Sequence, residues 1–124
     1  KMRIRTLSQG MKQQLTLAIA YATGARYLLL DEPMNALDPS RVDLHSEILR
    51  KLADSGTCII MSSHILDSVD RLCDEILFLK DGRLIRSIPQ DDAAPKSPGS
   101  HFAKPAGRAE GALSTYRRLY EKGG

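Results

Sequence analysis

Two acidic residues and a histidine stand directly after two short apolar runs of this sequence. Asp31 and Glu32 follow residues 27–30, and His64 is separated from residues 57–61 by two serines. In an open α/β sheet, ligands bind beyond the carboxyl ends of the strands. Neighbouring strands would therefore bring a carboxylate pair and an imidazole to one crevice, which suits a hard cation and a phosphate. Asp31 can hold Mg²⁺ there, and Glu32 can accept a proton from an attacking water.

Each of these residues also has a purely structural interpretation. An Asp-Glu-Pro sequence after an apolar run is typical of the turn that ends a strand, and a Ser-Ser-His sequence is typical of a helix cap. Ser8 and Asp38 both stand where the N-cap of a helix is expected, and Pro39 suits the first helical position. Short motifs of this kind become specific only in combination and in order.

The apolar periodicity predicts the helices that position these residues. Residues 11–22 are apolar on nearly every face, which is typical of a buried helix. A second helix begins at Asp38 and ends at Gly56, and a third, amphipathic helix extends to Cys73. The apolar face of the second helix is formed by Leu44, Ile48 and Leu52, with Leu49 alongside them.

The same pattern predicts two kinds of strand. Residues 27–30 and 57–61 are apolar without alternation, which favours parallel strands buried on both faces. Residues 75–80 and 83–88 are joined by Asp81-Gly82, the strongest short signal for a β-hairpin. Strands and helices in this order indicate an α/β domain with a partly parallel sheet.

A change of composition divides the chain into three predicted segments. Residues 1–88 form the domain, and residues 89–108 form a linker because they hold four of the six prolines and no Leu, Ile or Val. Residues 109–124 form a terminal helix, with its apolar side at Leu113, Tyr116 and Tyr120 and with Leu119 beside them. We expect this helix to be a solvated, amphipathic end of the chain rather than part of the core.

Length and composition limit the classes of protein to consider. The chain has 124 residues, a formal charge of +3 and 42% hydrophobic residues, so one ordinary globular domain is expected. No apolar run is long enough to span a bilayer, and no clustered basic stripe indicates a nucleic-acid partner. Cys58 and Cys73 stand in apolar surroundings and are predicted to be buried, reduced thiols of a cytosolic protein. Because the sequence begins at Lys1, we expect a truncated or processed product.

Taken in order, these motifs resemble those of the nucleotide-binding domains of ABC-type ATPases. The resemblance extends from residue 7 to residue 88. Four segments carry it, namely Leu7-Ser8-Gln9-Gly10-Met11 for the signature loop, Tyr27-Leu28-Leu29-Leu30-Asp31-Glu32-Pro33 for the Walker B strand, Asn35-Ala36-Leu37-Asp38-Pro39 for the D-loop and Ser62-Ser63-His64 for the switch histidine.

The resemblance implies a role for each site residue and for two ligands, ATP and Mg²⁺. The loop of Ser8, Gln9 and Gly10 would contact the γ-phosphate of an ATP molecule held mainly by a second nucleotide-binding domain, through the serine hydroxyl and the Gly10 N–H. Asp31 would bind Mg²⁺, Glu32 would be the general base and His64 would hold the γ-phosphate and the water. Asp38 would lie at the interface of a head-to-tail dimer that encloses two ATP molecules.

The sequence departs from the family pattern in two respects. Gln9 and Met11 replace the glycine and the glutamine of the commonest signature, Leu-Ser-Gly-Gly-Gln. In addition, no G-x-x-x-x-G-K-[ST] sequence is present, so the glycine-rich phosphate cradle and its lysine are absent. The chain therefore resembles a partial P-loop NTPase (RecA-like) fold, its carboxyl-terminal half, without the P-loop strand. Alone, it is expected to bind ATP weakly and to hydrolyse essentially none, and its open sheet edge favours a homodimer or larger assembly.

Three functions are compatible with this resemblance. The leading one is the ATP-binding, energy-coupling subunit of an ABC transporter, working with a transmembrane permease at the cytoplasmic face of the cell membrane. Residues 10–15 are most similar to ATPases that serve drug, lantibiotic or polysaccharide exporters. The alternatives are a non-catalytic dimerisation or regulatory half-domain and a soluble ABC-type ATPase not tied to transport. The sequence that precedes Lys1 in the gene would separate the first two functions, since a P-loop there supports the first.

Overall fold

The computed structural model describes residues 3–89 and 111–121. These residues form two compact units, one up to His64 and one from Ile65 onward. The boundary between these units, after residue 64, differs from the boundaries predicted from composition, after residues 88 and 108. The predicted division into domains stays a prediction. Each unit is described separately below.

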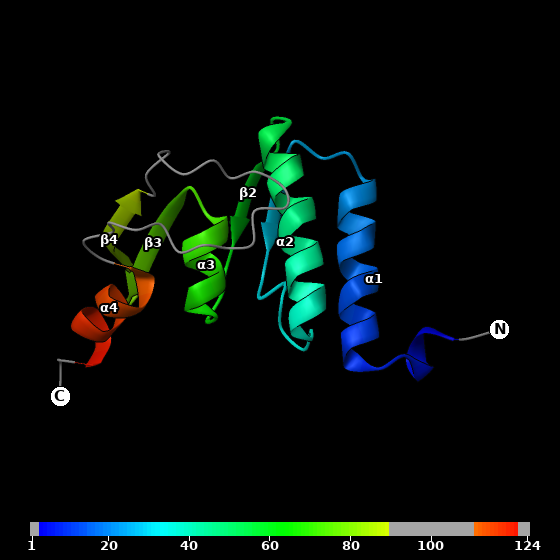
Figure 1. Ribbon diagram of the computed structural model, residues 1–124, viewed down its shortest axis with the longest axis horizontal. Helices are drawn as coiled ribbons and strands as arrows, with labels where there is room; N and C mark the ends of the chain where they lie inside the picture. Colours follow the sequence, from blue (N-terminus) through cyan, green and yellow to red (C-terminus); the bar gives the residue numbers. More distant parts are fainter. Residues whose placement is uncertain (1–2, 90–110, 122–124) are drawn as a thin grey trace. The chain divides into compact units, whose positions relative to one another are not determined.

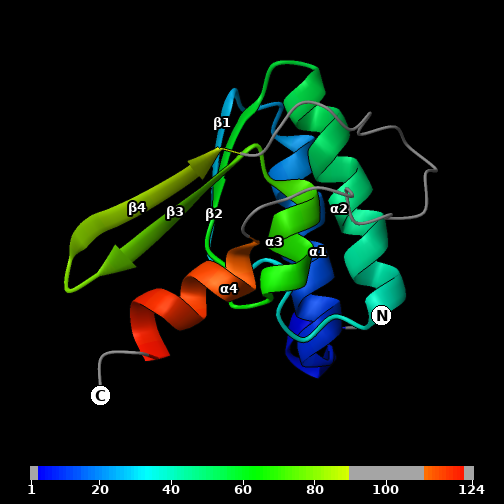
Figure 2. The same ribbon diagram turned by 60° about the vertical axis from the view of Figure 1, so that its left-hand side comes forward.

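The first unit is a β–α–β arrangement preceded by a helix. After a short 3₁₀ turn at Ile4–Thr6 it consists of α1 (Gln9–Ala22), β1 (Tyr27–Leu30), α2 (Pro39–Asp54) and β2 (Cys58–Met61). β1 and β2 pair in parallel, with Tyr27 opposite Cys58 and Leu30 opposite Met61. α1 and α2 lie side by side against one face of this two-stranded sheet (Figures 1 and 2). The predicted α/β fold with a parallel pair joined by a crossover helix is confirmed.

Both long helices begin at the predicted capping residues. The Ser8 hydroxyl accepts a hydrogen bond from the Met11 N–H at 3.2 Å, and the Asp38 carboxylate accepts one from the Arg41 N–H at 3.2 Å. Each cap satisfies a backbone donor that has no partner within its own helix. Pro39 occupies the first turn of α2, where it removes no hydrogen bond.

The burial predicted for the first unit is wrong in part. In α1 only Leu17 is buried, and the Ile19 residue is 59% exposed although the whole segment was expected to lie in a core. In β1, Leu29 is 82% exposed, and Cys58 of β2 is exposed as well. The reason is that, within the described residues of the first unit, both long helices lie on one face of the sheet. β1 and β2 therefore have one exposed face, although their sequences have the apolar pattern of strands buried on both faces.

The buried face of α2 agrees with the predicted one at Leu49 but not at Leu44. His45, Ser46 and Leu49 are buried, whereas Leu44 is exposed. The helix is rotated so that His45 reaches Tyr21 of α1, and their ring centroids lie 5.8 Å apart. Packing against a neighbouring helix has thus decided the orientation, and apolar periodicity alone did not.

The second unit packs a hairpin and two helices. It contains α3 (Leu66–Leu72), β3 (Glu75–Lys80), β4 (Arg83–Pro89), and α4 (Ala112–Tyr116), which continues into a π-helical turn at Arg117–Glu121. β3 and β4 are antiparallel, as predicted. Asp81 and Gly82 between them have φ values of +50° and +72°, the left-handed pair that a tight two-residue hairpin requires.

The terminal helix belongs to the core of this unit, contrary to expectation. Val69, Ile76, Phe78 and Ala112 form a buried cluster that joins α3, β3 and α4. Ala112 and Thr115 are 0% exposed. Of the predicted apolar side, Leu113 and Tyr116 are exposed, whereas Tyr120 packs against the cluster. Contact with α3 and β3 selected the face with small residues. The predicted linker lies outside the described residues except for Pro89, which ends β4. Residues 109–110 and 122–124 of the predicted terminal helix also lie outside them.

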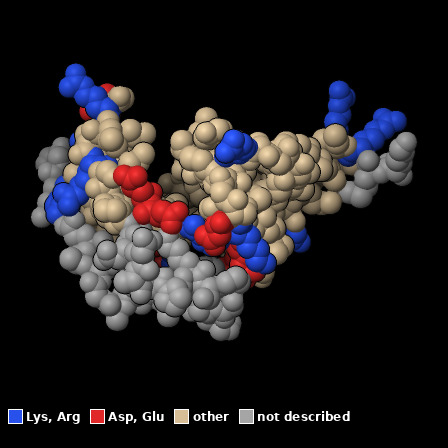
Figure 3. Space-filling model, turned by 90° about the horizontal axis from the view of Figure 1, so that it is seen from above, with Lys and Arg blue, Asp and Glu red and all other residues tan. Residues whose placement is uncertain are grey.

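Two properties of the surface bear on the choice of partners. Within the described ranges, no helix combines the length and the apolar character needed to cross a membrane. On the face drawn in Figure 3, lysine and arginine side chains stand singly or in small groups, and some of them lie beside aspartate or glutamate side chains.

Candidate active site

The ends of β1 and β2 bring an acid and a histidine into contact. His64 Nδ1 lies 2.8 Å from Glu32 Oε2. The side chains of His64 and Glu32 are 67% and 36% exposed, so a ligand from solvent can reach both. The predicted proximity of these two residues is thus observed, because parallel neighbouring strands end at the same edge of a sheet.

A serine that sequence reasoning left without a role connects the two acidic residues. The Ser62 hydroxyl accepts a hydrogen bond from the Glu32 N–H at 2.8 Å and donates one to Asp31 Oδ1 at 2.5 Å. The Ser62 N–H donates to the carbonyl oxygen of Leu30 at 2.9 Å, which extends the strand pairing by one residue. Ser62 therefore holds the Asp31 carboxylate in one orientation. Its position directly after β2 was the only signal for this role.

Glu32 has a backbone conformation that is unusual for a side-chain-bearing residue. Its φ is +46°, in the left-handed region that costs about 1–2 kcal/mol for an L-residue. The turn that follows compensates, because the Glu32 carbonyl accepts the Asn35 N–H at 3.0 Å and Pro33 and Met34 are buried. Gln13 of α1 donates to the Pro33 carbonyl at 2.9 Å. The surroundings thus hold Glu32 in a conformation that it would not adopt alone.

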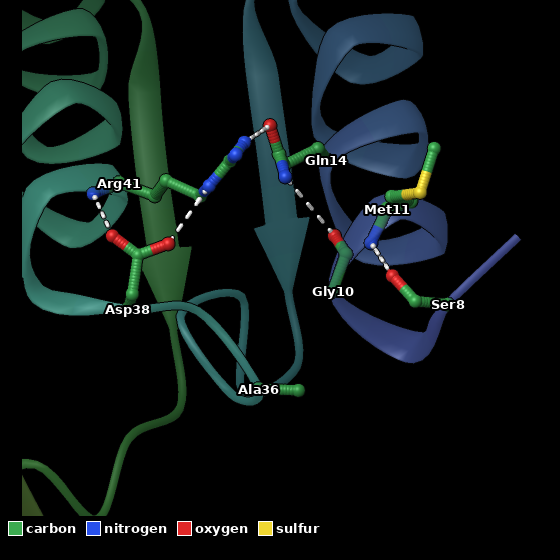
Figure 4. A pocket seen from close by; sticks show the side chains of 7 residues that line it. All are labelled: Ser8, Gly10, Met11, Gln14, Ala36, Asp38 and Arg41. Carbon is green, nitrogen blue, oxygen red and sulfur yellow. Dashed lines mark hydrogen bonds and ion pairs between the residues drawn. The ribbon is translucent and has the colours of Figure 1, made fainter.

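A second group of predicted site residues lines a separate pocket of about 280 Å³. The pocket lies where α1 begins and α2 begins (Figure 4), and the turn after β1 contributes to its wall. Its lining consists of Ser8, Gly10, Met11, Gln14, Ala36, Asp38 and Arg41. The structure therefore divides the predicted site into two clusters, with Asp31, Glu32 and His64 in one and Ser8, Gly10 and Asp38 in the other. Gln9 is exposed and belongs to neither.

Gly10 allows the start of α1 to approach the turn after β1. A Cβ atom at this position would lie 2.9 Å from the carbonyl oxygen of Ala36, closer than real Cβ contacts. Ala36 itself has a φ of +63°, so its backbone cannot turn away without changing the whole loop. The glycine of the signature-like loop is thus required for contact between two segments that are distant in sequence.

Arg41 connects the walls of this pocket and was not predicted. Its guanidinium contacts Asp38 Oδ2 at 2.8 Å and donates a second hydrogen bond to Gln14 Oε1 (Figure 4). Gln14 in turn donates to the Gly10 carbonyl at 3.4 Å. Arg41 follows Asp38 by three residues in a helix, which is the signal that could have identified the pair. The contact with Gln14 is visible only in the tertiary structure.

A polar pair of buried His45 and partly buried Tyr21 lies between the same two helices, outside both clusters. The Tyr21 hydroxyl and His45 Nδ1 are 2.9 Å apart. Burial lowers the pKa of His45, and the Arg41 guanidinium lowers it further. Burial raises the pKa of Tyr21 to about 12.

These two pKa shifts predict a window of maximal stability. The unfolded histidine takes up a proton below about pH 6.5, whereas folded His45 resists protonation, so the free energy of unfolding should fall between pH 7 and pH 5.5. Unfolded tyrosine ionises near pH 10 while folded Tyr21 stays protonated, so stability should also fall as the pH rises from 10 toward 12. Urea denaturation at each pH measures both effects. His45→Gln should flatten the acidic part and Tyr21→Phe the alkaline part, and curves unchanged by these variants would contradict the assignment.

The chain is similar to known proteins of one family. The profile of the ABC transporter family matches residues 1–35. The Nod factor export ATP-binding protein I of Neorhizobium galegae is 40% identical over 87 residues, which cover 70% of this chain and 25% of the relative. The lantibiotic transport ATP-binding protein SrtF of Streptococcus pyogenes is 40% identical over 85 residues, which cover 68% of this chain and 37% of the relative.

A solved structure agrees with the sequence relatives. It is titled as the structure of an ATP binding subunit of an ABC transporter and superimposes with a TM-score of 0.67 at 30% identity, covering 72% of this chain and 37% of that one. This chain thus spans between 25% and 37% of the length of the relatives and the structure named here.

Proposed function

Because this chain belongs, over the matching residues, to the ATP-binding proteins of ABC transporters, we propose two roles for it in such a protein. It carries the general base of ATP hydrolysis, and it carries the residues that contact the γ-phosphate of an ATP molecule held by a second domain. In the complete protein it would bind and hydrolyse ATP in a head-to-tail dimer. The observation that carries this proposal is the contact of Glu32 with His64 at the ends of two adjacent parallel strands.

Glu32 is the proposed general base. Its carboxylate is open to solvent, and the turn that holds its backbone places it at the end of β1. His64 contacts one of its oxygens, which leaves the other for a water molecule. The carboxylate oxygen accepts the Nδ1–H of His64, so the second ring nitrogen can donate to a phosphate oxygen when the imidazole carries both protons. His64 would help to orient the water. Glu32 would take its proton as the bond from the water oxygen to the γ-phosphorus forms and the bond to the bridging oxygen of the departing ADP breaks.

Asp31 is the proposed protein ligand of Mg²⁺. Ser62 occupies Asp31 Oδ1 and thereby directs the carboxylate. Within the described part of the chain, no three His, Cys, Asp or Glu side chains gather as a metal site. This fits Mg²⁺ bound to a nucleotide, since that ion usually takes one or two carboxylates and fills its other positions with phosphate oxygens and water. The ion would neutralise charge on the phosphates.

Ser8 and Gly10 are proposed to contact the γ-phosphate of an ATP molecule held by the second domain. They stand at the start of α1, a helix of fourteen residues whose amino-terminal end attracts anions. The Ser8 hydroxyl accepts the Met11 N–H, so its own proton remains available for a phosphate oxygen. Gly10 presents no side chain in the way. Asp38, held by Arg41, is proposed to face the second domain.

The family relationship also supports a proposal for the partners of this protein and for its location in the cell. We infer a second nucleotide-binding domain, a transmembrane permease and a peripheral position at the cytoplasmic face of the membrane. Export is favoured because relatives named for the export of Nod factor and the transport of a lantibiotic match two thirds or more of this chain. One observation favours a second candidate, a non-catalytic dimerisation or regulatory half-domain. These 124 residues contain no P-loop sequence, so the phosphate cradle would have to come from elsewhere.

A nucleotide titration tests the proposal that this chain contacts the γ-phosphate but does not hold the rest of the triphosphate. A fluorescent ATP analogue with Mg²⁺ should bind this chain far more weakly than micromolar, because the described residues offer contacts to the γ-phosphate but no cradle for the rest of the triphosphate. Fluorescence anisotropy measures the affinity, and a complete ABC ATP-binding protein serves as the positive control. Micromolar binding to the chain alone would contradict the proposal.

A further inference from the structure

The helix α4 lies in a groove between α3 and β3 of the second unit. Ala112 and Thr115, the small residues of its buried face, are 0% exposed. The groove is lined by Val69 of α3 and by Ile76 and Phe78 of β3. Figures 1 and 2 both draw α4 beside these elements. Leu119 and Tyr120 of the following turn pack against the same cluster.

Two polar contacts fix the direction and register of this helix. Both oxygens of the Asp70 carboxylate accept the Ala112 N–H, at 2.9 and 3.0 Å. At the other end, the Tyr120 hydroxyl donates to the carbonyl oxygen of Leu79. Asp70 therefore meets the amino-terminal end of the helix, where unsatisfied N–H groups attract a carboxylate. Gly111 permits this approach, since a Cβ there would lie 3.1 Å from Asp70 Oδ2.

The contact of α4 with α3 and β3 is specific, but it includes one unfavourable feature. The Thr115 hydroxyl is buried and has no hydrogen-bond partner among the described residues. A buried hydroxyl without a partner weakens a contact, whereas an apolar group of the same shape does not. The helix is also short, with five residues in α4 and five in the turn that follows, and helices of that length are not stable in isolation. Its formation therefore depends on the groove.

We propose that the groove of α3 and β3 is a binding site for a short helix, and that residues 111–121 are its tethered, exchangeable occupant. The site accepts a helix whose first residue donates its N–H to the Asp70 carboxylate. This helix has small or β-branched apolar residues at its first and fourth positions and an aliphatic residue at its eighth position. Covalent linkage raises the effective concentration of the helix, so a weak contact suffices to keep it in place. A free helix with the same spacing and a better fourth residue displaces it.

The intact chain permits a test with three matched variants. Hydrogen exchange of the Ala112 amide, followed by NMR, reports the opening of the helix from the groove. Thr115→Val should increase the protection of this amide by about tenfold, because it removes the buried hydroxyl without changing the shape. Tyr120→Phe should decrease it by about threefold or more, because it removes the hydrogen bond to Leu79. Leu113→Ala, at an exposed position of the same helix, should change it by less than about twofold.

Exchange of the occupant is tested on the same intact chain. An added peptide of residues 111–121 carrying Thr115→Val should lower the protection of the chain's own Ala112 amide in proportion to its concentration, while the amides of Ile76 and Phe78 remain protected. A peptide of scrambled sequence should have no effect. The proposal is overturned if Thr115→Val and Tyr120→Phe shift the protection in the same direction. It is equally overturned if the peptide leaves the Ala112 amide unchanged, because the helix would then be a permanent part of the fold.

Discussion

Glu32→Gln is expected to abolish ATP turnover by the complete ATP-binding protein while nucleotide binding persists. Glutamine keeps the size of the side chain and a hydrogen-bond acceptor for His64, but it cannot accept a proton from water. General base catalysis contributes about 10²–10⁴-fold to rate, so phosphate release should fall at least to that extent. The backbone of residue 32 should remain in place, since its N–H is held by Ser62 rather than by its own side chain.

The measurement is steady-state release of inorganic phosphate, combined with nucleotide binding to the same variant. Glu47→Gln provides the matched control, because Glu47 is an exposed residue of α2 outside both site clusters. This control should retain full turnover. Hydrolysis at the normal rate in Glu32→Gln would remove Glu32 from the role of base. Loss of nucleotide binding together with turnover would indicate instead that the substitution disturbs the turn after β1.

Gly10→Ala is expected to destabilise the first unit, against the direction that helix propensity predicts. Alanine is favoured over glycine within a helix by about 1 kcal/mol, so a propensity effect alone would raise stability. In the structure the new Cβ would lie 2.9 Å from the carbonyl oxygen of Ala36, and this atom belongs to backbone that cannot yield locally. Overpacking of this kind costs about 1–3 kcal/mol, and the 2.9 Å approach to a backbone atom favours the upper part of that range, so the expected net loss is about 1–2 kcal/mol.

Urea denaturation followed by circular dichroism measures this effect on the free energy of unfolding. Gln9→Ala is the appropriate control, because residue 9 precedes Gly10 in the same helical turn and is exposed. Its effect should stay within about 0.5 kcal/mol. A Gly10→Ala variant that is more stable than the original chain would show that the start of α1 and the turn at Ala36 do not approach each other as closely as described.

Local patterns in the sequence were sufficient to predict the helices and strands and one part of the candidate site. The caps at Ser8 and Asp38 and the hairpin at Asp81 depend on neighbouring residues alone, and they are found as predicted. The contact of Glu32 with His64 was also predictable, although 32 residues separate them. Two short apolar runs joined by a helix form adjacent parallel strands, and the carboxyl ends of such strands meet.

The tertiary structure alone decided which faces are buried and which residues support the site. The bridge of Ser62 between Asp31 and Glu32, and the approach of Gly10 to Ala36, join segments that no local pattern relates. The burial of Ala112 depends likewise on contact with α3 and β3. Periodicity tells how apolar a face is, but which face is covered depends on what packs against it. Propensities and caps act within one turn or strand, whereas packing is settled only once distant segments have met.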